Sequence, residues 1–217
     1  MRPSHLARLT RPDIQFATFY AARYQRDPGI AHWKTTKRTM RYVKQTKHYK
    51  MEADPNRPFL EALCDSDWMQ DPEKYASTSG YMICMKGIPI LAKSRLQKLT
   101  AKSSTAAEII ALCDCVEEIV WVINLLEEIG YKTRPTIWVD NKPCIQTVER
   151  NQLTKGNKNL AMRYHFIKGY LRNERLRIRK ISTEDNIADM LTKPLARNKL
   201  KTFASKVLNT SVNGNRT

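Results

Sequence analysis

The stretch Phe59-Leu60-Glu61-Ala62-Leu63-Cys64-Asp65-Ser66-Asp67-Trp68 decides the fold class, because it joins a buried apolar run to two closely spaced carboxylates. We expect a strand over residues 59–65, and two further apolar segments at 81–85 and 88–92 predict two more strands. Lys86-Gly87, between the last two segments, is a turn sequence. The three segments together predict an antiparallel meander.

Alternating helices and strands are expected after the meander. The segment 103–129 is apolar almost all round and predicts a long, largely buried helix that ends at Gly130. Strands are expected at Thr136-Ile137-Trp138-Val139 and at 176–181. Three shorter helices are expected: one beginning near Pro143, one over 162–171 and one ending near Lys193-Pro194. This order is typical of an α/β protein with a mixed sheet and helices on its faces.

Residues 1–55 differ from the rest, because they carry 12 basic residues against 4 acidic ones. One helix is expected to begin at Pro12-Asp13 and a second to span about 32–46. Apolar residues of the second helix should face a core: Trp33, Met40 and Val43. Its basic residues recur at three- and four-residue steps and make one cationic face, either a solvated surface or a phosphate-binding one: Lys34, Lys37, Arg38, Arg41 and Lys44.

The net charge of +17 is unusual, whereas 41% hydrophobic and 27% charged residues are ordinary for a soluble protein. Such an excess attracts nucleic acid through phosphate contacts and counterion release. An anionic membrane surface is the weaker alternative, since no segment approaches the length of a transmembrane span. The five cysteines show no paired spacing, which indicates reduced, buried thiols of an intracellular protein rather than a zinc site or disulfides.

Four carboxylates stand at the ends of expected elements: Asp65, Glu108, Asp140 and Asp189. Each has an ordinary structural interpretation. Asp65 can start a turn, and Glu108 completes a capping box that begins at Thr105. Asp140 can cap the helix near Pro143, and Asp189 can complement a helix dipole.

The joint arrangement of these acids favours a metal site instead. Strand ends and the first turn of a packed helix converge in such a sheet, so Asp65 and Asp140 should be neighbours. Glu108 and Asp189 would reach in from helices. Uncompensated carboxylates repel strongly in a low dielectric, and a pair of Mg²⁺ ions, which prefer carboxylate oxygen, would relieve that repulsion. Asp67 is the alternative first ligand if the strand ends two residues later than expected.

At these residues the chain resembles the copia-type (Pseudoviridae) LTR retrotransposon Pol polyproteins, over the end of the reverse transcriptase and the following ribonuclease H domain. Each motif alone is weak, but their order over about residues 10–196 is specific. The motifs are Arg11-Pro12-Asp13-Ile14, His32-Trp33, Arg41-Tyr42-Val43-Lys44-Gln45-Thr46, Cys64-Asp65-Ser66-Asp67-Trp68, Ser77-Thr78-Ser79-Gly80-Tyr81, Lys93-Ser94-Arg95-Leu96-Gln97, Ser103-Ser104-Thr105-Ala106-Ala107-Glu108, Asp140-Asn141, Arg163-Tyr164-His165-Phe166-Ile167 and Ala188-Asp189-Met190-Leu191-Thr192-Lys193-Pro194-Leu195.

The resemblance implies a ribonuclease H-like fold, a five-stranded mixed sheet flanked by helices, for residues 56–196. Residues 1–55 would be a basic helical remnant of the reverse transcriptase thumb or connection region, and residues 197–217 a frayed polar tail. The implied partners are an RNA–DNA hybrid and the upstream polymerase region of the same polyprotein, without a membrane. The implied location is intracellular, in the cytoplasm within a virus-like particle or in the nucleus.

The resemblance also implies the chemistry. Two Mg²⁺ or Mn²⁺ ions would be held by the family's quartet, and the RNA strand of the hybrid would be hydrolysed: Asp65, Glu108, Asp140 and Asp189. Asp65 would bridge both ions. Further candidates for phosphate contacts, each equally explicable as a solvated charge, are Lys93, Arg95, Lys98, Lys102, Arg163 and Lys168, beside Lys34, Arg38 and Arg41.

The chain departs from the family's motifs in places. Ala106 stands where the family has a glutamate, and Lys158-Asn159-Leu160-Ala161 replaces Lys-His-Ile-Asp. No histidine lies between Arg179 and Asp189, where many cellular ribonucleases H carry one. These changes leave the quartet intact and imply slow turnover or a copy that drifted after selection relaxed. No Tyr-x-Asp-Asp pair occurs, so the polymerase palm is expected upstream.

Three functions remain open on the sequence. The first is a metal-dependent ribonuclease H, and the second is a non-catalytic nucleic-acid-binding remnant of a decayed retrotransposon polyprotein. The third is an integrase-like strand-transfer enzyme on a related fold. That enzyme would carry a final glutamate on a late helix, whereas the late acid here is Asp189, and the chain has no His/Cys zinc module.

Overall fold

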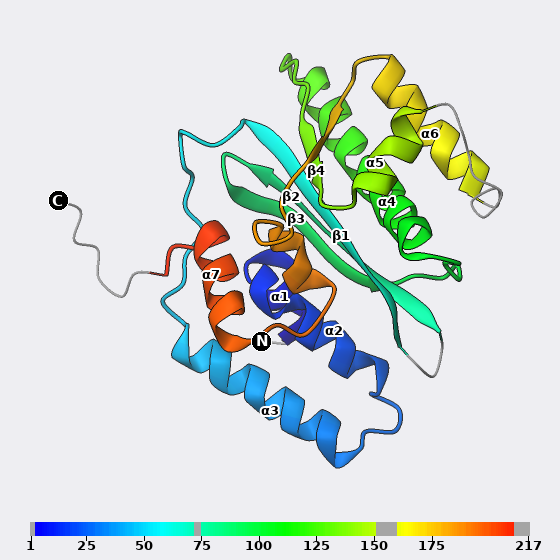
Figure 1. The fold of residues 1–217 in the computed structure, drawn as a ribbon. Helices are drawn as coiled ribbons and strands as arrows, with labels where there is room; N and C mark the ends of the chain where they lie inside the picture. Colours follow the sequence, from blue (N-terminus) through cyan, green and yellow to red (C-terminus); the bar gives the residue numbers. More distant parts are fainter. Residues whose placement is uncertain (1–2, 72–74, 151–159, 211–217) are drawn as a thin grey trace.

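A five-stranded mixed sheet forms the centre of the computed structural model, which describes residues 3–71, 75–150 and 160–210 (Figure 1). The strands follow the order β3-β2-β1-β4-β5. β1, β2 and β3 are antiparallel, whereas β4 runs parallel to β1 and β5 parallel to β4. Their bounds are β1 Leu60–Asp71, β2 Ala76–Met85, β3 Ile88–Leu96, β4 Thr136–Val139 and β5 Arg177–Lys180. The meander and the predicted ribonuclease H-like α/β class are confirmed.

One face of the sheet is covered by α4 (Ser104–Glu128), with α5 (Lys142–Glu149) and α6 (Ala161–Arg172) beside it (Figure 1). The helix α4 is apolar on most of its sides because it packs between the sheet and α6. Even-numbered residues of β1, such as Ala62 and Cys64, face this core. Alternation along the strand then directs Leu63 and Asp65 to the opposite face.

The opposite face is covered by five segments: α1 (Pro3–Leu9), η1 (Pro12–Ile14), α2 (Gln15–Arg23), η3 (Ile187–Leu191) and α7 (Arg197–Val207). Figure 1 shows α3 (Ile30–Gln45) outside this layer, and it contacts α2. Gln15 Nε2 donates a hydrogen bond to the Ala92 carbonyl of β3 at 2.7 Å. α1, η1 and α2 therefore pack on the same sheet, and the origin of residues 1–55 in a reverse transcriptase stays a prediction.

Two expectations about local structure are wrong. α3 has no buried residue, and the side chains of Trp33 and Met40 are 57% and 53% exposed, so they do not face a core. β1 does not end at Asp65 but continues to Asp71, because β2 pairs with it beyond the end of β4. All five cysteines are free and buried, as expected. Within the described ranges, no helix combines the length and the apolar character that a membrane span requires.

The expected polar tail is also wrong over its first half. Residues 197–207 form α7, whose side chains Phe203 and Val207 are buried in the apolar cluster on the face of the sheet opposite α4, together with Leu63 and Met82. We call this cluster the second core, and Leu208 also belongs to it. The segment resembles a polar tail because its polar residues outnumber the few apolar ones that meet the core. Residues 211–217 lie outside the described ranges, as do Lys158 and Asn159.

Replacing Phe203 by alanine is expected to lower the free energy of unfolding by about 3–5 kcal/mol, as for other buried aromatic side chains. Phe203 is 1% exposed, whereas Lys201 on the same helix is exposed and provides the control, for which a change within about 0.5 kcal/mol is expected. Urea unfolding measures both. Equal stability of the two variants would show that α7 does not dock in solution.

Candidate metal centre

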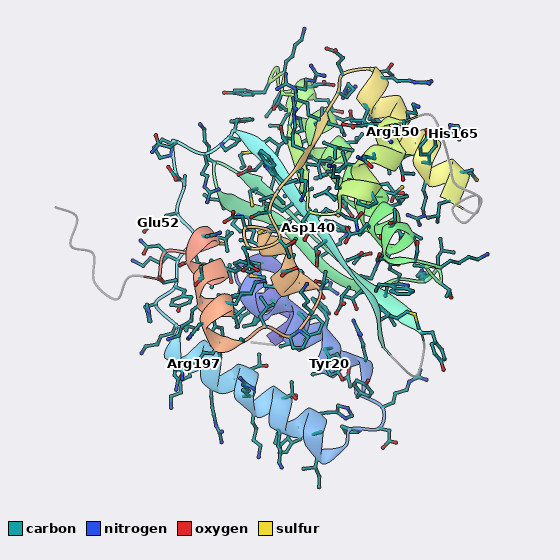
Figure 2. The ribbon with its side chains drawn as sticks, in the orientation of Figure 1. Tyr20, Glu52, Asp140, Arg150, His165 and Arg197 are labelled. Atoms are coloured by element: carbon teal, nitrogen blue, oxygen red, sulfur yellow. The ribbon has the colours of Figure 1, made fainter. Side chains whose placement is uncertain are left out.

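Asp65 and Asp140 are brought together by the register of β1 and β4. The parallel pairing places Cys64 opposite Val139, so the next residues along the two strands, Asp65 and Asp140, are neighbours at the end of β4. Asp65 is buried and Asp140 is half-buried. Figure 2 shows Asp140 in the middle of the molecule, near the orange segment that follows β5.

The capping alternatives for two of the acids are excluded by the helix ends. The N-cap of α4 is Ser103, whose side chain accepts the amide N–H of Ala106 at 3.1 Å, so Glu108 belongs to no capping box. The N-cap of α5 is Asn141, whose Oδ1 accepts the amide N–H of Cys144 at 2.8 Å. Since neighbouring residues cap both helices, the carboxylates of Glu108 and Asp140 are available for other contacts.

Asp189 reaches the site because η3 is fixed to the strand that carries Asp65. Asn186 Nδ2 donates to the Cys64 carbonyl at 3.0 Å. Its Oδ1 also accepts the amide N–H of Ala188, which starts the turn. At the other end of η3, the hydroxyl of Thr192 donates to Asp65 Oδ2. One carboxylate oxygen from each of Asp65, Asp140 and Asp189 lies within 4.8 Å of the other two.

Glu108 borders this cluster from the other face of the sheet. Its Oε1 accepts the amide N–H of Ser66 at 3.3 Å, directly after Asp65 in the chain. Its Oε2 is buried and makes no hydrogen bond with any described residue. A buried, unpartnered carboxylate oxygen beside three further acids fits the donor set of a hard divalent cation.

Burial and mutual repulsion penalise the charges of this site when no cation is bound. Burial, and then the charge of Asp189, raise the pKa of Asp65 to about 7. Burial, followed by the charge of Asp65, raises the pKa of Glu108 well above its usual range. A bound cation would favour the ionised forms and relieve the penalty.

Asp67, the alternative first ligand, does not belong to the three-acid cluster. β1 does run past Asp65, as that alternative required, but it does so as part of the hairpin with β2. Asp67 pairs in register with Thr78, two residues beyond the cluster. Burial raises its pKa, which Lys193 opposes. The geometry therefore favours Asp65.

Two lysines beside Asp189, Lys193 and Lys199, were not among the site residues predicted from the sequence. Lys193 Nζ lies 2.8 Å from Asp189 Oδ1, and Lys199 Nζ lies 3.1 Å from Asp189 Oδ2. The four-residue spacing of Asp189 and Lys193 is a signal that could have revealed the first pair. No local signal marks Lys199, because its approach depends on how α7 docks.

The candidate phosphate contacts divide into two groups. Five are exposed and form no ion pair within the described ranges: Lys34, Arg38 and Arg41 on α3, and Lys98 and Lys102 before α4. The other four have protein partners. Arg95 and Arg163 both pair with buried Asp114, at 2.6 and 2.9 Å. Lys93 pairs with Glu118, and buried Lys168 donates to the Tyr164 hydroxyl at 3.2 Å.

The ion pairs of Lys93, Arg95 and Arg163 show that these three residues help to hold β3 and α6 against α4. Arg95 comes from β3 and Arg163 from α6, and the two share one carboxylate of α4. The exposed group is the better source of phosphate contacts, although all nine assignments stay predictions.

Comparison with known proteins places the chain among transposon proteins. It is 34% identical over 201 residues to the retrovirus-related Pol polyprotein from transposon RE2 of Arabidopsis thaliana, and 35% identical over 201 residues to that from transposon RE1 of the same plant. Each match covers 91% of this chain. The chain belongs to the copia-type, retrovirus-related Pol polyproteins. This Pol segment is also 33% identical over 193 residues, 88% of its length, to the Pol polyprotein from transposon TNT 1-94 of Nicotiana tabacum.

The Pol segment spans only 14% of the length of each of these relatives. No family model matches it. Among solved structures, LC11-RNase H1, isolated from compost by a metagenomic approach, has a TM-score of 0.49 at 18% identity, covering 61% of this chain and 91% of that one. RNase H1 from the archaeon Halobacterium salinarum NRC-1 has a TM-score of 0.44 at 14% identity, covering 61% and 93%. The fold class rests on the strand order of the Pol segment itself.

Proposed function

We propose that this Pol segment is a metal-dependent ribonuclease H that hydrolyses the RNA strand of RNA–DNA hybrids during retrotransposon reverse transcription. The observation that carries the proposal is the convergence of Asp65, Asp140 and Asp189 within 4.8 Å, on a sheet of the ribonuclease H-like order. Membership of the retrovirus-related Pol polyproteins supports a reverse-transcription role.

The residues of the site have distinct parts in this proposal. Asp65, Asp140, Asp189 and Glu108 would hold two Mg²⁺ or Mn²⁺ ions. When bound, such ions lower the pKa of a water molecule and stabilise the leaving oxygen of an in-line phosphoryl displacement. The Thr192 hydroxyl and the Ser66 amide hold the carboxylates of Asp65 and Glu108 in place. Asn186 fixes η3, and with it Asp189, against β1.

The substrate would be held through its phosphates, because the chain carries a net charge of +17. The exposed lysines Lys98 and Lys102 precede α4, the helix that carries Glu108, and would contact phosphates of the hybrid. Contacts to 2′-hydroxyls would distinguish the RNA strand from the DNA strand.

Cleavage of an end-labelled RNA–DNA hybrid by purified protein tests this proposal. With Mg²⁺ or Mn²⁺ we expect RNA fragments that end in 3′-hydroxyls and 5′-phosphates, and with EDTA we expect none. Asp140→Asn should abolish cleavage while the protein stays folded, because Asp140 is a half-buried ligand with no role in capping α5. Asp185→Asn is the matched control, since Asp185 lies four residues before Asp189 but is exposed and pairs with Lys206.

Cleavage that persists in EDTA or in Asp140→Asn would contradict the proposal. Tight, salt-sensitive binding of the hybrid without cleavage in either metal would instead support the non-catalytic remnant. The exposed cationic face of α3 favours that second function, because it offers phosphate contacts independent of the acids.

A further inference from the structure

Both oxygens of Asp189 face lysine ammonium groups. Asp189 is 0% exposed, so each neighbouring charge acts on it with little screening. Lys193 lies in the segment that directly follows η3 and pairs with Oδ1. Lys199 comes from α7 and pairs with Oδ2 at 3.1 Å. The ammonium group of Lys199 therefore reaches the acid site from α7, whereas Asp189 itself lies in η3.

The position of Lys199 is set by the docking of α7. Phe203 and Val207 anchor the helix in the second core, and the ammonium of Lys199 lies 5.2 Å from the centre of the Phe203 ring. A second carboxylate is also within reach, because Glu184 Oε2 lies 3.9 Å from Lys199 Nζ. The Glu184 side chain is 85% exposed, so it competes weakly with buried Asp189 for the lysine.

We infer that Lys199 is a tethered counter-ion of the acid site, which pairs with Asp189 in the metal-free protein and turns to Glu184 when Asp189 ligates a divalent cation. The inference rests on the proposed function, since it requires that Asp189 be a metal ligand. Lys199 is a positioning residue that sets how readily the site accepts a cation, and it contacts no reacting atom.

A counter-ion of a metal ligand and a purely structural ion pair predict different effects on Mg²⁺ affinity when the lysine charge is removed. A positive charge beside a ligand oxygen repels an incoming cation, so removing the charge should tighten Mg²⁺ binding by roughly three- to tenfold for a partly exposed, screened group. The same removal leaves the acids less compensated, so the metal-free protein should melt at a lower temperature.

Mg²⁺ titration of the purified chain, read as the shift in Tm without nucleic acid, tests the inference. Lys199→Met should reach half of the Mg²⁺-induced shift at roughly three- to tenfold lower Mg²⁺ than the wild type. Lys199→Arg keeps the charge and should restore the wild-type midpoint. Lys199→Gln serves as a second neutral variant if the methionine variant does not fold.

Lys206→Met is the matched control. Lys206 lies on the same helix and pairs with a carboxylate at 2.9 Å, but its partner Asp185 is outside the acid cluster. Its Mg²⁺ midpoint should equal that of the wild type. Glu184→Gln should raise the midpoint about twofold, and this effect should vanish in the Lys199→Met background if it acts through the lysine.

The possible outcomes distinguish a failure of the inference about Lys199 from a failure of the proposed metal-dependent function. No Mg²⁺-induced shift in the wild type would overturn the metal site and the inference together. A normal shift in the wild type with an unchanged or higher midpoint in both neutral Lys199 variants would overturn the inference alone. An equal lowering of the midpoint in Lys206→Met would also overturn it, because the effect would then reflect net charge and not contact with Asp189.

Discussion

Replacing Asp65 by asparagine is expected to abolish hybrid cleavage while it stabilises the metal-free protein. Asp65 places a carboxylate oxygen within 4.8 Å of one from each other member of the cluster, and its Oδ2 accepts the Thr192 hydroxyl. The loss of activity should exceed about 100-fold, because the loss of a mere partner of a metal ligand already costs 10- to 100-fold. Asparagine keeps the size of the side chain and an oxygen that can accept the Thr192 hydrogen bond, so the fold should persist.

The stabilising part of this expectation follows from the pKa of Asp65. Burial and the charge of Asp189 raise it to about 7 in the folded protein, against about 3.9 in an unfolded chain. The folded protein then binds the proton more tightly, so ionisation of Asp65 lowers the free energy of unfolding as pH rises between these two values. The asparagine variant lacks this loss. Its advantage should be absent near pH 4 and reach on the order of 2 kcal/mol above pH 7.

Urea unfolding in EDTA at several pH values, with and without added Mg²⁺, measures both effects. The wild type should regain stability with Mg²⁺ at pH 8, whereas Asp65→Asn should gain little, because a ligand is missing. A variant that is less stable than the metal-free wild type at pH 8 would contradict the account of electrostatic penalty in this site.

Replacing Gly80 by alanine is expected to lower the free energy of unfolding by about 2–3 kcal/mol, as overpacked sites do, and to impair the metal site as well. Gly80 pairs with Asp65 across β1 and β2, so its missing side chain would lie beside Asp65 on the same face. A Cβ there would lie 2.6 Å from Thr192 Cγ2 and 2.8 Å from Leu191 Cβ. η3 would have to move away from the sheet, and Asp189 with it.

Gly169→Ala is the control for this change. Gly169 lies in α6, and an added Cβ would meet nothing within 4 Å, so alanine should stabilise the helix by roughly 0.5–1 kcal/mol. Urea unfolding and the Mg²⁺ dependence of Tm compare the two variants. If Gly80→Ala kept wild-type stability and Mg²⁺ response, the close packing of η3 on β2 would not hold in solution.

The sheet and two of its acids were predictable because they depend on short-range patterns. The apolar runs, the turn at Lys86-Gly87 and the long apolar helix specify elements locally, and their order implies the mixed sheet. Asp65 follows Cys64 in β1, and Asp140 follows Val139 in β4, the parallel neighbour of β1. Their proximity therefore follows from strand order, without knowledge of how the helices pack.

Packing decided what these local patterns left ambiguous. Thr105 and Glu108 look like a capping box, but the N-cap of α4 is Ser103, two residues before Thr105, and this frees the glutamate for the site. Trp33 and Met40 have the spacing of a buried face, yet both are more than half exposed, because the described contacts of α3 with α2 leave them uncovered. In both cases the local pattern is compatible with two arrangements, and only the surroundings choose between them.

By itself, then, the sequence determined the order of the elements along the chain, the fold class and the pairing of Asp65 with Asp140, because each depends on residues that are near in the chain or in adjacent strands. Only the tertiary structure decided that α7 closes the second core and brings Lys199 to Asp189, and that Gly80 makes room for η3. These contacts join residues more than 100 positions apart or elements of mixed polarity. No periodicity encodes them, since their energy arises only when the sheet and its second layer have come together.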